Sequence, residues 1–349
     1  MNKILALLLS PFAFLYGLGV SIHQGLYFNG FLKSTSFSIP VISVGNLSVG
    51  GTGKSPHIEY LLRFLRQYLF PGVISRGYKR KTDGFRLVTV VDSAELSGDE
   101  ALQIKRKFPE IPVAVSESRG LGIPLFLAKH PEIQTILMDD GYQHLQVKPG
   151  MNILLTEYAN PYFKDYLLPS GRLREWRYGS QRADAIIVTK CPHQPDEQEK
   201  KAWAKRLKLT EHQALFFSKM TYGDPYSLFN PSRIFKLNDG LHVVLLSAIA
   251  QSDYITDFLK DQVSAVTEFP FEDHHFFTEE EIDAVIKKYQ SISHFNKLIL
   301  TTEKDAVRLE KFKEKLEGVE IFILPMKIHF FEEDKFLAYL KNFLLEFKI

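Results

Sequence analysis

Residues 45–57, GNLSVGGTGKSPH, constrain the fold of this chain more than any other stretch. A short β-branched run at residues 37–46 leads into them, and apolar residues recur at helical spacing over residues 58–69. Pro56 suits the first turn of such a helix, because its missing N–H has no partner to lose there. A glycine-rich loop between a strand and a helix is the setting of a phosphate-binding loop. The stretch therefore predicts an α/β fold with an anion site at a helix N-terminus.

The loop departs at one position from the usual pattern G-x-x-x-x-G-K-[ST], because Ser48 stands where the first glycine is expected. That glycine begins the turn and touches phosphate least, so serine is tolerable. Lys54 supplies a charge for the β- and γ-phosphates, and Ser55 supplies a hydroxyl for Mg²⁺. The alternative is a glycine-rich turn without a ligand, which the flanking strand and helix make the weaker reading. The expected nucleotide-binding residues are Ser48, Val49, Gly50, Gly51, Thr52, Gly53, Lys54 and Ser55.

Apolar strand-like runs alternate with helical stretches along most of the chain, which predicts a mostly parallel α/β sheet. Near residues 215–233 the pattern changes to polar and aromatic segments with turn residues, and a second α/β run follows. We expect residues 31–215 to form a P-loop NTPase-like domain. Residues 216–235 would be a linker in the form of a β-ribbon, and residues 236–349 a smaller α/β domain.

The N-terminus carries 19 residues without a charge, from Ile4 to Ile22. A bilayer core takes roughly 20 apolar residues to span. Pro11, Gly17 and Gly19 interrupt the run. A cleaved signal peptide and a buried core helix are the alternatives. We expect residues 1–30 to form a retained hydrophobic helix that associates with a membrane, either spanning it or lying in its interface.

Composition excludes several classes of function. The chain has 43 basic and 41 acidic residues, so no overall field favours nucleic acid, and we expect no nucleic-acid partner. The single cysteine, Cys191, excludes an internal disulfide and any multi-cysteine zinc site. A reducing compartment fits this cysteine usage.

A second phosphate-site element is expected where a neighbouring strand ends. In ILMDDGYQH, Asp139 and Asp140 follow an apolar run and are placed to hold Mg²⁺, although turn residues would look the same. The nucleotide is expected to be ATP. A GTPase would show D-x-x-G, but Met138 stands where its aspartate belongs, and the strand end at residues 189–192 has no acid to bind guanine.

Three further stretches are rich in reactive side chains. In SGDEA, Asp99 and Glu100 form either a catalytic site or the acidic first turn of a helix. In LPSGRLREWR, the arginines suit an anionic substrate or a solvated charged face. In FEDHHFF, His274 is a candidate functional histidine or an ordinary core histidine, and no further ligand lies at metal spacing.

Together these motifs carry a resemblance to a known family. The stretches are VGNLSVGGTGKSP, SRGYKR, SGDEA, DDGYQH, LLPSGRLRE, RADAIIVTK, FPFEDHHF and TTEKDAVRL. Their order and extent are similar to the tetraacyldisaccharide 4'-kinase (lipid A 4'-kinase) family, whose loop also has Thr or Ser at the position of Ser48. One departure is SAIAQS at residues 247–252, where Ala248 and Ser252 replace the Gly and Pro of the family's turn.

The resemblance implies a function. Members of this family transfer the γ-phosphate of ATP to the 4'-hydroxyl of tetraacyldisaccharide 1-phosphate and so form lipid IVA. They act at the cytoplasmic face of the inner membrane, and no obligate protein partner is implied. An acylated substrate would account for the apolar N-terminus, and its 1-phosphate for the arginines. The rivals are another ATP-dependent enzyme of the same fold and a membrane-bound ATPase switch that acts on a protein.

The resemblance also implies roles for particular residues. Asp99 would be the base that takes the 4'-hydroxyl proton, His274 its partner, and Lys54 the third catalytic residue. The expected Mg²⁺ site comprises Ser55, Asp139, Asp140, Gln143 and Glu175. The expected substrate-binding residues are Arg76, Glu100, Arg119, His144, Arg172 and Arg174. Closure of the two domains would complete the site and exclude water.

Overall fold

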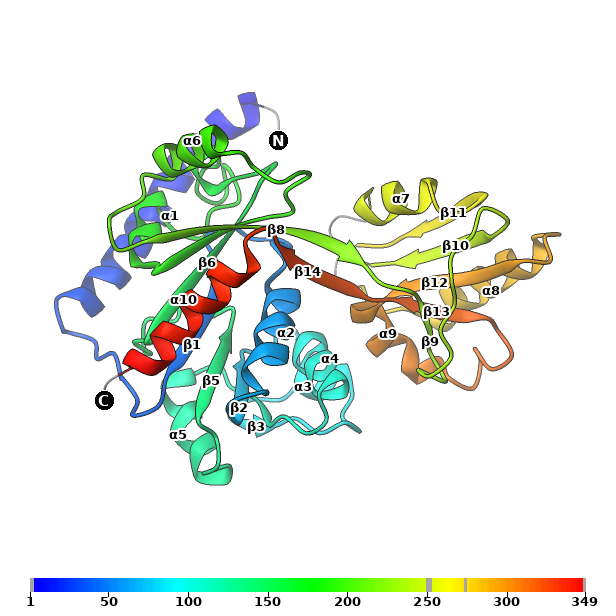
Figure 1. The fold of residues 1–349 in the computed structure, drawn as a ribbon, viewed down its shortest axis with the longest axis horizontal. Coiled ribbons are helices and arrows are strands. Elements are labelled where there is room, and N and C mark those ends of the chain that lie inside the picture. The colour runs from blue at the N-terminus through cyan, green and yellow to red at the C-terminus, as the bar shows by residue number, and fades with distance from the viewer. Residues whose placement is uncertain (1–2, 249–252, 273–274, 348–349) are drawn as a thin grey trace.

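The larger of two sheets is built around the strand that precedes the glycine-rich loop, in a computed structural model that describes residues 3–248, 253–272 and 275–347 (Figure 1). Nine strands form this sheet within the described residues. From one edge to the other they are β14 (Met326–Phe330), β8 (Ala214–Tyr222), β7 (Ala185–Thr189), β6 (Met151–Glu157), β1 (Val41–Asn46), β5 (Thr135–Asp139), β2 (Pro71–Ser75), β4 (Val113–Val115) and β3 (Arg86–Leu87). Only the edge strands β14 and β3 run antiparallel to their neighbours. The expected mostly parallel sheet is confirmed.

The central strands are buried along their whole length, as parallel strands covered on both faces are. The helices of this domain are α1 (Lys3–Phe28), α2 (Lys54–Leu65), α3 (Ala94–Ser97), α4 (Asp99–Lys107), α5 (Arg119–Lys129), α6 (Glu197–Leu207) and α10 (Glu333–Glu346), with 3-10 turns at Tyr162–Lys164 and Arg177–Arg182. Helices α2, α4 and α10 pack on one face of the sheet, and α1, α5 and α6 on the other. The carboxyl ends of the parallel strands meet at one edge, where the functional loops follow.

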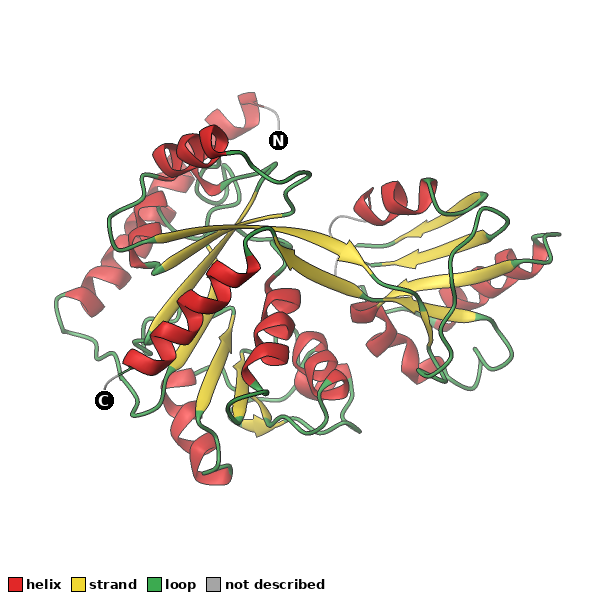
Figure 2. Ribbon diagram, in the orientation of Figure 1, coloured by secondary structure: helices red, strands yellow, loops and turns green. Residues whose placement is uncertain are grey.

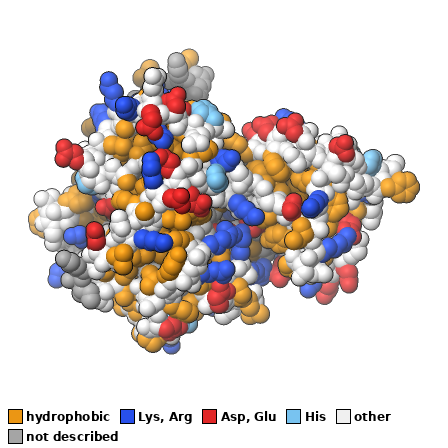
Figure 3. Space-filling model, in the orientation of Figure 1, with side chains coloured by type: hydrophobic (Ala, Val, Ile, Leu, Met, Phe, Trp, Pro, Cys, Tyr) orange, Lys and Arg blue, Asp and Glu red, His pale blue; other side chains and the backbone are white. Residues whose placement is uncertain are grey.

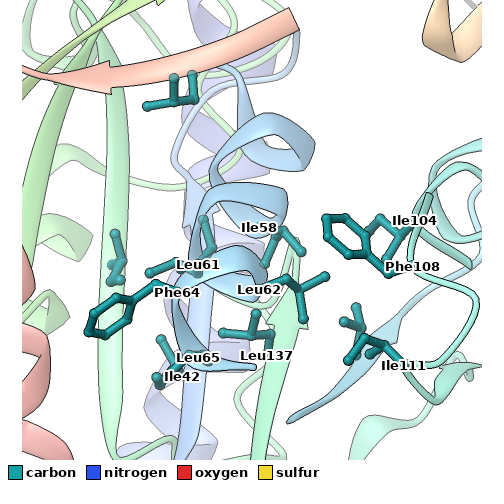
Figure 4. Packing of buried hydrophobic residues seen from close by; sticks show 14 of the residues in the cluster. Ile42, Ile58, Leu61, Leu62, Phe64, Leu65, Ile104, Phe108, Ile111 and Leu137 are labelled. Carbon is teal, nitrogen blue, oxygen red and sulfur yellow. The ribbon is translucent and has the colours of Figure 1, made fainter. Parts of the chain in front are cut away.

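Helix α2 forms where helical spacing predicts it, and its apolar residues point into the core (Figure 4). Leu62 and Leu65 are buried with Ile42 of β1 and Leu137 of β5. Ile58 packs on the side of α4. Burying a side chain of this size is worth about 1.5–3 kcal/mol, so this face fixes α2 firmly behind the loop.

A second sheet of five strands forms the smaller domain within the described residues. In order these are β11 (Ala265–Pro270), β10 (His242–Ser247), β12 (Lys297–Thr302), β13 (Ile321–Leu324) and β9 (Tyr226–Ser227). All neighbours are parallel except β9. The helices are α7 (Asp253–Lys260), α8 (Glu279–Ser291) and α9 (Glu303–Leu309), followed by a 3-10 turn at Glu310–Phe312.

The two domains are joined by a two-stranded ribbon whose strands come from distant parts of the sequence (Figure 2). Strand β8 leaves the larger sheet, and β14 returns beside it in antiparallel register, with Thr221 opposite Lys327. After β14, helix α10 packs back on the larger domain, where Phe336 and Leu340 are fully buried. The expected division placed all of residues 236–349 in the smaller domain. It differs from this arrangement because the apolar face of α10 is covered by the larger sheet.

Helix α1 has one docked side and one exposed apolar side. Ala13 is buried, and Gly17 accepts a hydrogen bond from Trp176 Nε1 at 3.0 Å through its carbonyl. Residues 4–28 contain an 18-residue window with a mean hydropathy of 2.0, of which 11% is buried, so the helix is long and apolar enough to cross a membrane. Its exposed apolar residues are Ile4, Leu5, Leu7, Leu8, Phe12, Phe14, Leu15, Tyr16, Leu18, Ile22, Leu26 and Phe28.

Candidate active site

A cavity of about 580 Å³ lies where the two domains meet. On the face shown in Figure 3, Lys and Arg side chains gather along this junction. The larger domain contributes the carboxyl edge of its sheet, and the smaller domain contributes α7, the start of α9 and the end of β13. The ribbon contributes residues of β8 and the start of β14. The residues that line the cavity include Ser48, Val49, Gly50, Gly51, Thr52, Gly53, Lys54, Ser55, Arg76, Asp99, Glu100, Asp139, Asp140, Arg174, Lys190 and Tyr254.

All eight residues expected from the glycine-rich loop line this cavity. Gly50 and Gly53 have φ angles of 111° and 88°, in the region that favours glycine, and Gly53 is the cap of α2. The loop is held from outside, because Val49 N donates to Arg172 O at 2.7 Å. It is also held from within, because Asn46 Nδ2 donates to Thr52 Oγ1 at 2.9 Å. The result is a fixed loop at the N-terminus of a helix, where an anion is favoured.

Lys54 lies among groups that define a charged end of the cavity. Its Nζ is 3.8 Å from Asp140 Oδ1 and 3.5 Å from Asn46 Oδ1. Arg174 donates to both Asp140 oxygens, at 3.0 and 2.9 Å, and to Asn46 O at 2.8 Å. Burial opposes ionisation of Asp140, but Lys54 and Arg174 outweigh it and lower its pKa below the usual range. Asp140 is therefore an ionised carboxylate that positions the lysine.

Asp139 is different from its neighbour. It ends strand β5, it is 1% exposed, and neither carboxylate oxygen has a hydrogen-bond partner among the described residues. Burial, reinforced by the nearby charge of Glu100, raises its pKa. A buried carboxylate without a donor is costly, so this side chain is suited to a cation.

Asp99 begins α4 and lines the cavity beside Glu100, and Arg76 follows β2 on the same side. The Asp99 carboxylate accepts from Arg308 of the smaller domain, with Nε at 3.0 Å from Oδ2. Thus two acids and one arginine of the expected site face the same space as the glycine-rich loop. His274, the expected partner of Asp99, lies outside the described residues.

Gln143 and Glu175, expected at the metal, form hydrogen bonds and an ion pair with other protein groups. Glu175 is 1% exposed, and Arg182 lies 2.9 Å from its Oε2. Gln143 Nε2 donates to Glu175 Oε1 at 2.8 Å and to Asn46 O at 2.9 Å, and Gln24 of α1 donates to Glu175 Oε2 at 2.6 Å. Neither side chain lines the cavity formed by the described residues. In this geometry Glu175 pairs with Arg182 and, through Gln24 and Gln143, links α1 to the loop, and the metal role of Glu175 and Gln143 stays a prediction.

Three of the expected substrate-binding residues are not among the described residues that line the cavity. Arg119 is 4% exposed and donates to the carbonyls of Asp139 and Asp140, at 3.3 and 3.2 Å. His144 Nε2 accepts from Arg119 N at 2.9 Å, and burial together with Arg119 lowers its pKa to about 4. Arg172 pairs with Asp165 at 3.1 Å. These side chains fix the backbone around the site, whereas Arg76, Glu100 and Arg174 line it.

Comparison with known proteins agrees with this geometry. A family model described as tetraacyldisaccharide-1-P 4'-kinase matches residues 5–345. The chain belongs to this family. The tetraacyldisaccharide 4'-kinase of Flavobacterium johnsoniae is 41% identical, over 94% of this chain and 94% of that protein. The enzyme of the same name from Bacteroides thetaiotaomicron is 39% identical, over 97% and 93%.

A solved structure is similar over nearly the whole length. It is the LpxK of Aquifex aeolicus in complex with ATP, with a TM-score of 0.74, 27% identity, and coverage of 97% of this chain and 99% of that chain. The similarity therefore extends over both domains and the ribbon. It agrees with a nucleotide site in this fold.

Sequence reasoning missed a charged pair beside the loop. Lys190 follows β7, donates to Glu157 at 2.5 Å, and lies 5.0 Å from the centre of the Tyr254 ring. The pair is almost fully buried, with side chains 6% and 4% exposed. A signal for Lys190 existed, because it ends a buried parallel strand. Tyr254 comes from the other domain, and no local pattern places it there.

Proposed function

We propose that this protein transfers the γ-phosphate of ATP to the 4'-hydroxyl of tetraacyldisaccharide 1-phosphate, forming lipid IVA for lipid A biosynthesis. Membership of the family supports the reaction and the substrate class. One structural observation carries the site. The glycine-rich loop, the Asp139–Asp140 pair and Asp99 come from three separate parts of the chain and line one cavity between the domains.

The loop and Lys54 would bind the phosphates of ATP. The helix N-terminus favours the negative charge, and Lys54 is held at the loop by Asp140 and Asn46 at 3.8 and 3.5 Å. Charge that develops on the phosphates during transfer is stabilised best by groups already in place. Arg174, fixed to Asp140, would add a second cation at this end.

The residues at this edge fit a Mg²⁺ ion. The fit rests on Asp139, whose buried oxygens have no donor among the described residues, and on the hydroxyl of Ser55 in the same cavity. Oxygen donors with one or two carboxylates are what Mg²⁺ takes beside phosphates. When bound, such an ion neutralises charge on the β- and γ-phosphate oxygens. Asp140 would hold Lys54 rather than the ion, because both of its oxygens already accept from Arg174.

The acceptor would enter from the side of α4. Asp99 would take the proton of the 4'-hydroxyl at its carboxylate, and Glu100 and Arg76 would orient the sugar or its phosphate. Phosphoryl transfer has a loose transition state, so positioning matters more than base strength. A partner role for His274 remains part of this proposal.

The exposed apolar side of α1 would bring the enzyme to its lipid substrate at the cytoplasmic face of the inner membrane. The docked side supports an interfacial position, because residues 13–24 contact the larger domain rather than lying free of it. Hydrogen bonds of Gln24 and Trp176 link this helix to the segment that carries Arg174.

The test is transfer of labelled phosphate from ATP to detergent-dispersed tetraacyldisaccharide 1-phosphate. We expect strong labelling by the wild type and a loss of about 10²–10⁴ in kcat for Asp99→Ala, the usual size of general-base catalysis. Asp257→Ala, which removes an exposed carboxylate of α7, is the control and should be unchanged. ATP hydrolysis without labelled lipid would overturn the proposal and favour an ATPase switch.

A further inference from the structure

Asp99 is held by a side chain from the other domain. Arg308 of α9 donates to Asp99 Oδ2 through Nε at 3.0 Å and through Nη2. The two residues are separated by 209 positions in the sequence. Asp99 lines the cavity, whereas Arg308 is not among the described residues that do. Within the described residues, Arg308 thus reaches the cavity through the carboxylate that it holds.

Arg308 is itself fixed on the smaller domain. Its Nη1 donates to Asp305 Oδ1 and to His275 O, both at 3.2 Å. Asp305 is locked in turn, because its Oδ2 accepts from Thr302 Oγ1 at 2.8 Å and from Ala248 N at 3.0 Å. The side chains of Arg308 and Asp305 are 0% exposed. The guanidinium is thus buried and fixed in position, with two of its N–H donors directed at Asp99.

The Arg308–Asp99 contact is not needed merely to hold the two domains together. Helix α4 is already joined to α9 by the ion pair of Lys107 with Glu303, and to the 3-10 turn after α9 by the ion pair of Arg106 with Glu310. A planar guanidinium with fixed donors sets the orientation of a carboxylate, which a flexible lysine does less well. We propose that Arg308 is a positioning residue for Asp99, which it orients toward the acceptor hydroxyl. This inference rests on the proposed function, in which Asp99 is the base.

The contact makes the base depend on the position of the smaller domain. Asp99 belongs to α4 of the larger domain and Arg308 to α9 of the smaller one, and the β8–β14 ribbon joins the two. A movement of the domains away from each other at the ribbon would separate the Asp99 carboxylate from the Arg308 guanidinium. Asp99 is then oriented only when the domains are together, and the proton acceptor is assembled at the moment that water is excluded.

The experiment is a mutant cycle in the full-length enzyme with ATP and tetraacyldisaccharide 1-phosphate. The variants are Arg308→Gln, Arg308→Lys, Asp99→Ala and the double variant Asp99→Ala with Arg308→Gln. The control is Glu310→Gln, which removes the neighbouring interdomain ion pair through a half-exposed carboxylate. For each variant kcat, KM for ATP and the thermal unfolding temperature are measured.

We expect Arg308→Gln to lower kcat by about 10²-fold, within the range for loss of general-base help, with KM for ATP within about threefold of the wild type. Arg308→Lys should recover at least about tenfold of that loss. The double variant should be no slower than Asp99→Ala, because a residue that acts through Asp99 has nothing left to position. Glu310→Gln should keep its kcat within about threefold.

A kcat for Arg308→Gln near that of the control would overturn the inference, and so would an equal loss in the Asp99→Ala background. If Arg308→Gln does not fold, Arg308→Lys with and without Asp99→Ala gives the same comparison. Full activity of Asp99→Ala would contradict the base role instead. The failure of this inference is therefore distinct from failure of the proposed function.

Discussion

Replacing Lys107 by methionine would leave two buried carboxylates facing each other without their cation. Lys107 Nζ lies 2.5 Å from Glu59 Oε2 of α2 and also contacts Glu303 of α9, so it joins both domains. The two carboxylates are 1% and 8% exposed. Burial and the charge of Glu303 raise the pKa of Glu59, and the charge of Lys107 lowers it. Removing Lys107 should therefore raise the pKa of Glu59 further.

The magnitude follows from the partners that remain. Breaking a buried ion pair by removing one partner costs about 3–5 kcal/mol. Glu59 keeps the Gln103 amide at 2.9 Å and the Arg63 guanidinium at 3.4 Å, and Glu303 keeps the N–H of Met326 at 3.2 Å. We therefore expect the lower end, about 3 kcal/mol of unfolding free energy at about pH 7.5. Lys81→Met is the control, because it removes an exposed pair with Glu95 and should cost less than about 1 kcal/mol.

The loss of unfolding free energy caused by Lys107→Met should be smaller at acidic pH. A carboxylate with a raised folded-state pKa destabilises the protein increasingly as pH rises from its unfolded-state pKa, about 4.3, toward its folded-state pKa, and protonation relieves this cost as pH falls again. Each pH unit in this window restores up to about 1.4 kcal/mol. Urea unfolding followed by Trp176 and Trp203, both in the larger domain, should show a deficit at least about 1 kcal/mol smaller at about pH 5.5 than at about pH 7.5. Equal deficits at both pH values would refute this reasoning.

Two further predictions concern the loop and the N-terminal helix. Lys54→Met should lower kcat for phosphate transfer at least about 100-fold with unchanged thermal stability, because it removes a fixed charge at the phosphates; more than a tenth of the wild-type rate in the labelled-ATP assay would contradict that role. Gly17→Leu should cost about 1–3 kcal/mol in urea unfolding, because a Cβ at Gly17 would lie 2.4 Å from Trp176 Cζ2. Gly19→Leu is its control, since a Cβ there meets nothing within 4 Å, and equal effects of the two changes would show that α1 is not docked as described.

Much of the larger domain could be predicted because its signals are local. The glycine-rich loop, the helix behind it and the buried parallel strands are each specified by a few neighbouring residues. The return of β14 and α10 could not be predicted, because β14 pairs with β8 over about a hundred intervening residues and only Ile328 and Phe330 of its five residues are buried. A short edge strand of this kind has no strong pattern.

The site likewise has residues that local sequence features could predict and contacts that only the fold shows. Lys54 and Asp139 were placed by a loop and a strand end, which are local features. The ion pair of Glu175 was not expected, because a carboxylate among arginines has the same sequence pattern whether it is a metal ligand or an ion-pair partner. Only the fold shows Arg182 beside it. The Asp99–Arg308 contact joins two domains, so no sequence spacing indicates it.

In the proposed reaction, the cavity between the domains brings the γ-phosphate of ATP to the 4'-hydroxyl of the disaccharide. The most direct test is to incubate the wild-type protein with ATP and tetraacyldisaccharide 1-phosphate and to locate the new phosphate by proton–phosphorus correlation NMR. The account predicts one added phosphate, coupled to the proton at carbon 4' of the distal sugar. A phosphate at another position, or ATP converted to ADP and free phosphate with the lipid unchanged, would contradict it.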